Sequence, residues 1–322
     1  MIAPADKIDI CFAHVAYRLQ ERFAALATGI SSFAVRDADT LMRRVGDADV
    51  LVISGLWQNY LLDHATRLRF IQSIGAGTDQ FPREELATRG IRLASARGVN
   101  ARAVAEHAMA LMLALNRRLP EACDNQSRCV WRGMIGDLSR REDELGGKTL
   151  LVVGLGDIGG RLAQLAKAFD MHVVGLRRHP ALGRGVADAV LPMDALNAVL
   201  PDADFVALAC PLTAETENLI DAEALNRMKP GAHLVNVARG RVVDEAALIE
   251  ALQTRRIAGA AIDVTAQEPL MPSSPLWAME HVLITPHTAG ETWRYEDNVI
   301  EILLDNLGRL WRGEQQLRNQ IV

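Results

Sequence analysis

The sequence predicts an α/β protein made of two doubly wound domains, each a parallel sheet covered by helices. Short β-rich runs alternate with amphipathic helical stretches along nearly the whole chain, and a polar stretch near residues 120–146 separates two such series. This alternation favours parallel sheets with helices on both faces. A length of 322 residues is also more typical of two domains than of one.

The composition is that of an ordinary globular enzyme, with 49% hydrophobic residues, 23% charged residues and a net charge of −5. This mild acidity, without a basic run, argues against a nucleic-acid partner. No apolar run approaches the roughly 18 residues of a membrane helix, and the N-terminus lacks the pattern of a signal peptide. The four cysteines do not have the spacing of a metal site: Cys11, Cys123, Cys129 and Cys210. We therefore expect no bound metal, and we expect reduced thiols, which are typical of a cytoplasmic protein.

The first βα series predicts the smaller domain. We expect strands over residues 7–13, 49–54, 69–75 and 90–95, and helices over 17–27 and 83–89. A long helix follows at 103–119, and because it is apolar on more than one face we expect it to be buried between the domains. Residues 120–146 then lose hydrophobic periodicity around Trp131, which predicts an arm.

The second βα series predicts the larger domain. Its expected strands cover 148–154, 172–176, 204–210, 232–238, 259–264 and 281–286, and its expected helices cover 158–168, 221–227 and 244–254. A last helix near 293–313 follows this series, and we expect it to cross back to the first domain. The predicted domains are therefore residues 1–98 with 292–322, and residues 99–291 with the arm.

The most informative motif is LLVVGLGDIGGRLAQLAKAF, residues 150–169, in which a strand runs through a glycine-rich turn into a helix. In this context Gly154 allows the tight turn, Gly156 lets the backbone approach a pyrophosphate, and Gly159 lets the helix pack closely on the strand. The N-terminus of the helix, at Asp157 and Ile158, offers N–H groups to the phosphates. The motif predicts that the second βα series forms a Rossmann nucleotide-binding domain. We expect the first series to form a smaller flavodoxin-like substrate domain.

The expected cofactor-selecting position carries two arginines, Arg177 and Arg178, at the end of the strand VVGL. Arg177 lies 23 residues after Gly154, close to where an NAD-binding unit has an acidic residue for the ribose hydroxyls. Arginine cannot accept those hydrogen bonds, and its planar fork suits a phosphate. We therefore expect NADP(H) to be preferred, with NAD(H) or a merely solvated strand end as the alternatives.

Three polar side chains follow predicted strands: Arg239 in AHLVNVARG, Glu268 in GAAIDVTAQEP and His287 in HVLITPHTAG. Each alone is commonly a surface or turn residue. Ligands of doubly wound sheets bind outside the carboxyl ends of the strands, so the three could meet in one cleft. A guanidinium can hold a substrate carboxylate, an imidazolium can protonate a carbonyl oxygen, and a carboxylate can orient the imidazole. The set predicts hydride transfer to a 2-oxo acid.

With these motifs, the sequence resembles the D-isomer-specific 2-hydroxyacid dehydrogenases over nearly its whole length. The matching stretches are GAGTD (75–79), GVNARAVAEHAMALML (98–113), VVGLGDIGGRLA (152–163), PLTAETENLI (211–220), NVARGRVVDEAAL (236–248), AAIDVTAQEPL (260–270) and TPHTAGET (285–292). The resemblance implies Arg239 and the backbone of Ala76 and Gly77 as the substrate site, His287 as proton donor and acceptor, and Glu268 as its partner.

For the cofactor, the resemblance adds Pro211 and places Asp263 near the nicotinamide carboxamide. It also implies a homodimer built on the nucleotide-binding domains with the arm contributing. His107 is better interpreted as packing between domains than as a catalytic group. Because the acid of the NAD-dependent members is absent at Arg177, the chain most resembles the NADPH-dependent glyoxylate and hydroxypyruvate reductases.

Two questions stay open at the level of the sequence. The identity of the 2-oxo acid depends on side chains of the first domain, with Leu56 and Trp57 as candidates for lining the cleft. A nucleotide-sensing binding protein, like the corepressors that resemble this family, is the alternative to an enzyme, because such proteins keep the same three polar residues.

Overall fold

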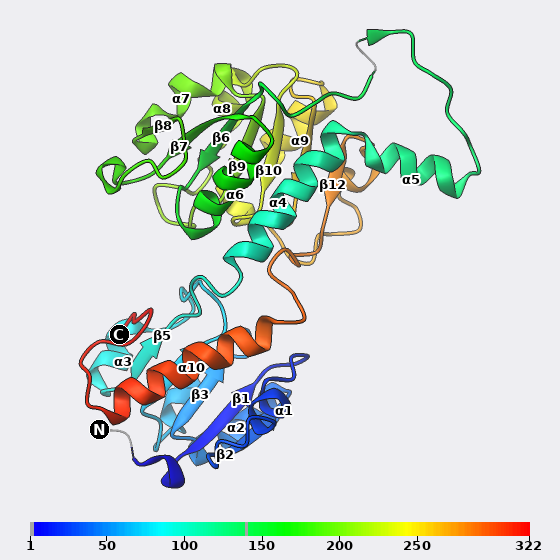
Figure 1. Ribbon diagram of the computed structural model, residues 1–322. Coiled ribbons are helices and arrows are strands. Elements are labelled where there is room, and N and C mark those ends of the chain that lie inside the picture. Colours follow the sequence, from blue (N-terminus) through cyan, green and yellow to red (C-terminus); the bar gives the residue numbers. More distant parts are fainter. Residues whose placement is uncertain (1–2, 139–140) are drawn as a thin grey trace. The chain divides into compact units, whose positions relative to one another are not determined.

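The computed structural model describes residues 3–138 and 141–322. The chain divides into two compact units (Figure 1), Met1–Asn100 with Thr292–Val322, here called unit 1, and Ala101–Glu291, here called unit 2. Each unit contains one parallel sheet with helices packed on it, which confirms the predicted α/β class. The first boundary falls at residue 100, where the sequence had suggested 98.

Unit 1 contains a five-stranded sheet in the order β2-β1-β3-β4-β5, which is the doubly wound order of flavodoxin-like folds. Its elements are β1 (Asp9–Ala13), α1 (Leu19–Ala24), β2 (Ser31–Val35), α2 (Ala38–Arg44), β3 (Val50–Ile53), β4 (Phe70–Ser73), α3 (Arg83–Thr88), β5 (Arg92–Ala94) and α10 (Tyr295–Trp311). The inner strands β3 and β4 are buried along their whole length, as expected for strands covered on both faces.

Helix α10 completes unit 1 although it comes from the far end of the chain. One face of the helix, spaced at three and four residues, is buried in the same core as Phe12 and Phe70: Tyr295, Val299, Ile300, Ile302, Leu303 and Leu307. The helix also packs against α1. Unit 1 is therefore discontinuous in sequence, and the chain enters and leaves unit 2 once.

Unit 2 contains a seven-stranded parallel sheet in the order β12-β11-β10-β9-β6-β7-β8, the order of a Rossmann fold with one added strand. Its elements are α4 (Ala101–Asn116), α5 (Leu119–Ser127), β6 (Thr149–Val153), α6 (Asp157–Ala168), β7 (His172–Leu176), β8 (Ala189–Leu191), α7 (Leu196–Val199), β9 (Phe205–Leu208), α8 (Ala222–Arg227), β10 (His233–Asn236), α9 (Glu245–Gln253), β11 (Gly259–Ile262) and β12 (Val282–Ile284). The chain order reverses between β6 and β9, where such sheets bind ligands.

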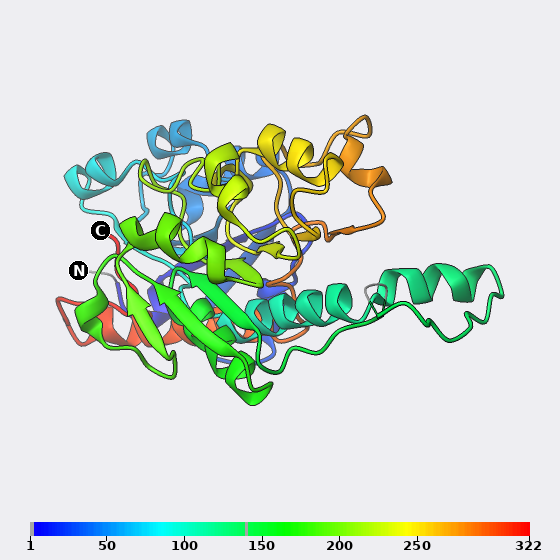
Figure 2. The same ribbon diagram turned by 90° about the horizontal axis from the view of Figure 1, so that it is seen from above.

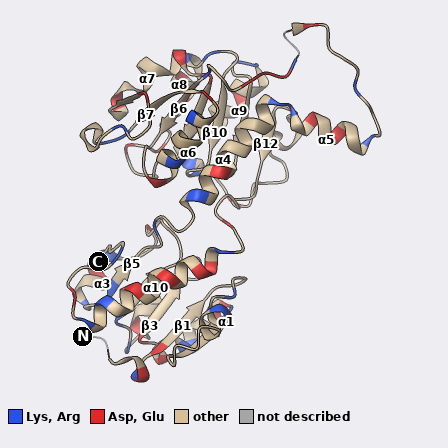
Figure 3. Ribbon diagram, in the orientation of Figure 1, with Lys and Arg blue, Asp and Glu red and all other residues tan. Residues whose placement is uncertain are grey.

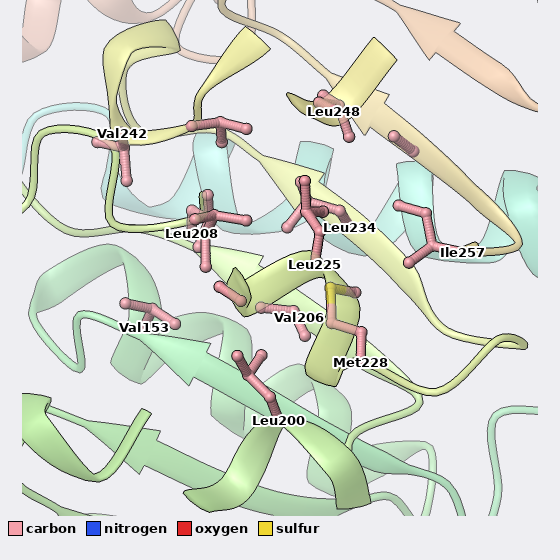
Figure 4. Packing of buried hydrophobic residues seen from close by; sticks show 14 of the residues in the cluster. Val153, Leu200, Val206, Leu208, Leu225, Met228, Leu234, Val242, Leu248 and Ile257 are labelled. Atoms are coloured by element: carbon pink, nitrogen blue, oxygen red, sulfur yellow. The ribbon is translucent and has the colours of Figure 1, made fainter. Parts of the chain in front are cut away.

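Each face of the unit 2 sheet has its own apolar core. On one face, side chains from β6, β9 and β10 meet those of α8 and α9, and Figure 4 shows Leu208, Leu225, Leu234 and Leu248 converging there. On the other face, α4 and α6 pack against each other and on the sheet through Ala105, Met112, Leu162 and similar residues. The long helix, which we expected to be buried between the domains, is thus buried by α6 and by the sheet of its own unit.

The structure corrects several boundaries. Strands β2 and β8 and helices α2 and α7 were not predicted. The long helix spans 101–116 instead of 103–119. The expected arm begins with helix α5, which buries no side chain, so its sequence shows no apolar stripe. Figures 1 and 2 show α5 and the segment after it extending away from the sheet of their own unit.

Across the described residues, no helix is both long enough and apolar enough to span a membrane. The same residues contain no group of three or more His, Cys, Asp or Glu side chains that could hold a metal ion. All four cysteines are free thiols, of which Cys11 and Cys210 are buried. Acidic and basic residues are interspersed along the helices of both units (Figure 3).

Candidate functional site

The candidate residues of unit 2 follow the carboxyl ends of neighbouring parallel strands. Along the sheet, His287 follows β12, Glu268 follows β11 and Arg239 follows β10. Continuing in the same direction, Pro211 follows β9, the glycine turn follows β6, and Arg177 follows β7. The carboxyl end of this sheet therefore carries both the polar residues predicted to take part in the reaction and those predicted to bind a dinucleotide.

The glycine turn after β6 allows three backbone segments to approach closely. Gly154 adopts a φ of +98°, and a Cβ on it would lie 2.6 Å from the Cys210 nitrogen. A Cβ on Gly159 would lie 2.2 Å from the Gly154 oxygen, so the first turn of α6 can pack on the strand only without a side chain here. The packing also brings the residue before Pro211 against the turn.

The start of α6 fits the pyrophosphate of a dinucleotide. Gly156 is the N-cap residue and no side chain caps the helix, so the first N–H groups have no acceptor within the helix. A Cβ on Gly156 or Gly160 would meet no atom within 4 Å, so the backbone borders open space. The N-terminus of a 12-residue helix combines N–H donors with a partial positive charge, which suits an anion.

The two arginines after β7 have different surroundings. Arg177 is half-buried, and its Nη1 donates to the Gly183 carbonyl oxygen at 3.1 Å. Arg178 is exposed, and its Nη2 lies 3.5 Å from Oε2 of Glu215, whose pKa is lowered by its bond to Thr213 and by this guanidinium. The sequence could not distinguish the two positions, and the structure places Arg177 at the pocket described next.

A pocket of about 370 Å³ lies between α6 and the loop after β7, and Arg177 is one of its walls. Two further arginines line it, Arg161 on α6 and Arg184 on the loop. Sequence reasoning missed both. Arg161 lies one helical turn after Asp157 on the same face, so helical spacing could have identified it. Arg184 lies in an irregular glycine-flanked loop, where no sequence pattern indicates its direction.

Arg239 is presented by a tight turn after β10. The Asn236 side chain, only 1% exposed, accepts from the Ala238 N–H and donates to the Arg239 carbonyl oxygen, both at 3.0 Å. A Cβ on Gly240 would lie 1.9 Å from the Thr265 carbonyl carbon, so this turn packs directly against the loop that leads to Glu268. The half-buried Arg239 guanidinium donates from Nη1 to the Ala238 oxygen at 2.6 Å.

Glu268 and His287 form a direct pair. Glu268 Oε2 lies 2.7 Å from His287 Nδ1, and Oε1 accepts the Thr265 N–H at 3.2 Å. A carboxylate beside Nδ1 makes that nitrogen the donor, which leaves Nε2 as the atom that can gain or lose a proton. Both side chains are partly exposed, 39% for Glu268 and 49% for His287. The pair can therefore meet a solvent-borne molecule.

The backbone of His287 lies in the left-handed region, at a φ of +55°. Its N–H donates to the carbonyl oxygens of Asp263 and Thr285, at 2.8 and 3.0 Å. The Asp263 carboxylate, 2% exposed, accepts from the Thr285 hydroxyl and from the N–H groups of Thr288 and Ala289. Asp263 thus holds the loop that carries His287, a role that the sequence did not reveal.

His107 on α4 joins this network. Its Nε2 lies 2.9 Å from the Thr285 hydroxyl and 3.7 Å from Asp263 Oδ1. Within unit 2 it therefore supports the same loop through Thr285. From the sequence we expected His107 to pack between the domains, so its contact with Thr285 was not predicted.

Ala76 and Gly77 lie in unit 1, in the loop after β4. The loop is held by the Tyr295 hydroxyl, which donates to the Ile74 oxygen, and by the Ala96 N–H, which donates to the Gly75 oxygen at 2.9 Å. Within the part of the chain that the structure describes, the N–H groups of Ala76 and Gly77 have no acceptor. Two such neighbouring donors suit a carboxylate.

The two residues of unit 1 that were candidates for substrate specificity, Leu56 and Trp57, differ in their burial. Trp57 is a core residue, 4% exposed, with its ring against Phe81 at 5.0 Å and its indole N–H donating to Asn59. Its suggested place in a cleft lining is therefore wrong, because the loop after β3 turns this side chain into the core. Leu56 remains partly exposed.

Comparison with known proteins agrees with this geometry. Residues 109–289 match the family described as D-isomer specific 2-hydroxyacid dehydrogenase, NAD binding domain. The glyoxylate reductase of Korarchaeum cryptofilum is 34% identical over 279 residues, which cover 85% of this chain and 83% of that protein. The D-3-phosphoglycerate dehydrogenase of Methanocaldococcus jannaschii is 35% identical over 294 residues, 90% of this chain but only 53% of that longer protein.

Among solved structures, the NADPH-dependent glyoxylate/hydroxypyruvate reductase of Sinorhizobium meliloti in complex with NADP and malonate superimposes with a TM-score of 0.81. It is 28% identical, and the match covers 98% of this chain and 97% of that one. The match therefore extends over both sheets of this chain. The chain belongs to the D-isomer specific 2-hydroxyacid dehydrogenases, a family of oxidoreductases with a Rossmann nucleotide-binding domain.

Proposed function

We propose that this chain is an NADP(H)-dependent reductase of small 2-oxo acids, of the glyoxylate/hydroxypyruvate type, which forms D-2-hydroxy acids. Unit 2 is the proposed nucleotide-binding unit, and it carries Arg239, Glu268 and His287. The observation that carries the proposal is the 2.7 Å pair of His287 and Glu268 on the sheet edge that also presents Arg239 and the glycine turn. The glyoxylate reductases among its relatives support the substrate class.

His287 is the proposed proton donor for the substrate oxygen during reduction and the acceptor during oxidation. The nicotinamide cofactor, when bound, supplies or receives the hydride. As the carbonyl is reduced, its oxygen becomes more basic, and the Nε2 proton of an imidazolium satisfies it. Glu268 stabilises that imidazolium through Nδ1 and keeps the ring in one orientation.

Arg239 is the proposed holder of the substrate carboxylate, through its planar fork. In unit 1, Ala76 and Gly77 are the proposed substrate-binding residues, because their N–H groups have no acceptor within the described residues. The cofactor contacts in this proposal are Gly154, Gly156, Asp157, Ile158, Gly159, Arg177, Arg178, Pro211 and Asp263. Arg177 favours NADP(H), because it faces a pocket beside the strand end and no carboxylate pairs with it within the described residues.

A homodimer is the proposed assembly. The arm after α5 carries apolar side chains that are almost fully exposed, Trp131 at 98% and Met134 at 102%, together with Leu138. Exposed apolar groups gathered on one projecting segment indicate a protein interface. The four free thiols support the cytoplasm as the compartment.

The test is a matrix of substrates and cofactors. NADPH and NADH oxidation is followed by absorbance with glyoxylate, hydroxypyruvate and phenylpyruvate. We expect turnover with NADPH and glyoxylate or hydroxypyruvate. Tight NADPH binding without turnover of any of the three acids would favour the nucleotide-sensing alternative, and a preference for NADH would contradict the assigned cofactor.

A further inference from the structure

We propose that Arg161 and Arg184 complete, with Arg177, a site for the 2′-phosphate on the adenosine half of the cofactor. This inference rests on the proposed NADP(H) dependence and extends it to two residues outside the strand-end position. The ligand group is a phosphate monoester attached to a ribose.

The pocket beside α6 brings the three guanidinium groups to one place. Arg161 comes from the second turn of α6, Arg177 from the end of β7 and Arg184 from the loop that follows. The Arg177 bond to the Gly183 oxygen fixes the loop next to the strand end. The lining also includes Asp157, so the charge of these four side chains is positive by two.

Among the residues that line the pocket, three arginines face one carboxylate, that of Asp157. Within the described ranges, no carboxylate lies within ion-pair distance of Arg161, Arg177 or Arg184. Arg178 next door differs, because it pairs with Glu215. Unpaired cations in one concave site repel each other, and a dianionic phosphate would relieve this repulsion.

Arg161 has a further unsatisfied group. Its Nη1 donates to Gln164 at 3.0 Å, whereas its Nε is buried and has no partner among the described residues. Buried donors are nearly always paired, and an orphan calls for an explanation such as a missing ligand. Arg161 is therefore a pocket arginine whose donors the described protein groups leave partly unused.

The floor of the pocket leaves room for the ligand. Gly160 lines it, and a Cβ there would meet no atom within 4 Å. Leu155, 7% exposed, and Ala163 add a small apolar wall. The site lies on the same sheet edge as the helix N-terminus proposed for the pyrophosphate, so one nucleotide could occupy both.

The experiment measures binding of 2′,5′-ADP and 5′-AMP, which differ by the 2′-phosphate alone, by titration calorimetry on the full chain. The variants are Arg161→Gln, Arg184→Gln and Arg177→Gln. Arg227→Gln is the control, because this arginine pairs with Glu223 within α8. We expect the wild type to bind 2′,5′-ADP more tightly. Arg161→Gln should reduce that preference about tenfold and the more exposed Arg184→Gln about threefold. The 5′-AMP affinity should stay unchanged.

The outcomes separate the inference from the proposed function. A wild type that binds both nucleotides equally would overturn the NADP(H) assignment and the phosphate site together. A wild-type preference that Arg177→Gln removes, but that both Arg161→Gln and Arg184→Gln retain, would overturn the inference alone. Weaker binding of 5′-AMP in parallel with 2′,5′-ADP would also overturn it, because the arginines would then support the fold or the adenosine.

Discussion

His287 and Glu268 form an ion-pair geometry in which both carboxylate oxygens are used. Oε2 lies 2.7 Å from His287 Nδ1, and Oε1 accepts the Thr265 N–H at 3.2 Å. The second bond fixes the carboxylate, and the fixed carboxylate fixes the ring. The two residues are 19 positions apart and follow different strands, so the pair depends on the pairing of β11 with β12.

Replacing His287 by Ala should lower kcat for 2-oxo acid reduction by about 10²- to 10⁴-fold, the range typical of a positioned acid–base group. NADPH binding should stay nearly intact, because the ring supports no part of the glycine turn. Steady-state rates test the loss of kcat, and a fluorescence titration with NADPH tests the unchanged cofactor binding. A variant with full kcat would remove His287 from the chemistry.

Replacing Glu268 by Gln should retain part of the activity and shift its pH dependence. A neutral amide can still accept from Nδ1, but it no longer stabilises the imidazolium. The basic limb of kcat/KM for reduction should therefore move to lower pH, measured from about pH 5 to 9.

Glu245→Gln is the matched control for this shift. Glu245 Oε2 accepts the Ala266 N–H at 2.9 Å and so supports the same loop without touching His287. The basic limb of the kcat/KM profile of Glu245→Gln should lie at the same pH as that of the wild type. A Glu268→Gln limb that does not move would assign Glu268 a purely structural role.

Arg239→Lys tests whether the substrate carboxylate is bound by a fork. The lysine keeps the charge but loses the bidentate geometry, so KM for 2-oxo acids should rise about tenfold or more while cofactor affinity changes little. Arg241→Lys, two residues further on and paired with Glu217, should leave KM unchanged. A near-normal KM in Arg239→Lys would mean that the carboxylate is held elsewhere.

Arg177→Asp should lower kcat/KM with NADPH and improve the ratio for NADH. One charge-assisted hydrogen bond contributes about 1.5–3 kcal/mol, so the ratio should change by roughly 10- to 150-fold. Arg178→Asp should change it less, because Arg178 is paired with Glu215. The kinetic constants with both cofactors decide this, and an unchanged ratio in Arg177→Asp would reject the assignment.

The parts of the fold that sequence reasoning recovered are those with continuous apolar runs or helical stripes. The inner strands are buried on both faces, so β6 and β9 were visible as apolar segments. Strand β8 lies at a sheet edge and is only partly buried, and β2 at the other sheet's edge exposes Ser31. The apolar run is three residues long in β8, and in β2 it follows two serines, so both runs are shorter than the roughly four to eight residues on which the prediction depended.

The candidate site was predictable where a residue follows a strand or sits in a spaced motif. Neither condition applies to Arg184, which lies in a loop whose path is set by the Arg177 bond to Gly183. The support given by Asn236 and Asp263 also escaped sequence reasoning. Their buried side chains hold backbone groups of distant turns, and such partners become visible only when the strands are assembled.

The final prediction concerns stability and pH. His233 begins β10, with its ring stacked on Phe205 at 5.2 Å. Burial, followed by the positive charges of Lys148 and His281, lowers its pKa from 6.5 to about 4. The unfolded chain therefore binds a proton more readily than the folded chain between these two values. Stability should be complete above about pH 6.5 and fall as the pH drops towards 4, by about 2–3 kcal/mol from this residue.

His233→Gln removes the titrating group, so its denaturation midpoint should be lower than that of the wild type at pH 7.5 but should fall less steeply towards pH 4.5. Part of the slope should remain, because burial also lowers the pKa of His281. Urea denaturation of both proteins at half-unit pH steps measures the difference. If the two midpoints fall in parallel over this window, His233 is not the group whose protonation destabilises unit 2.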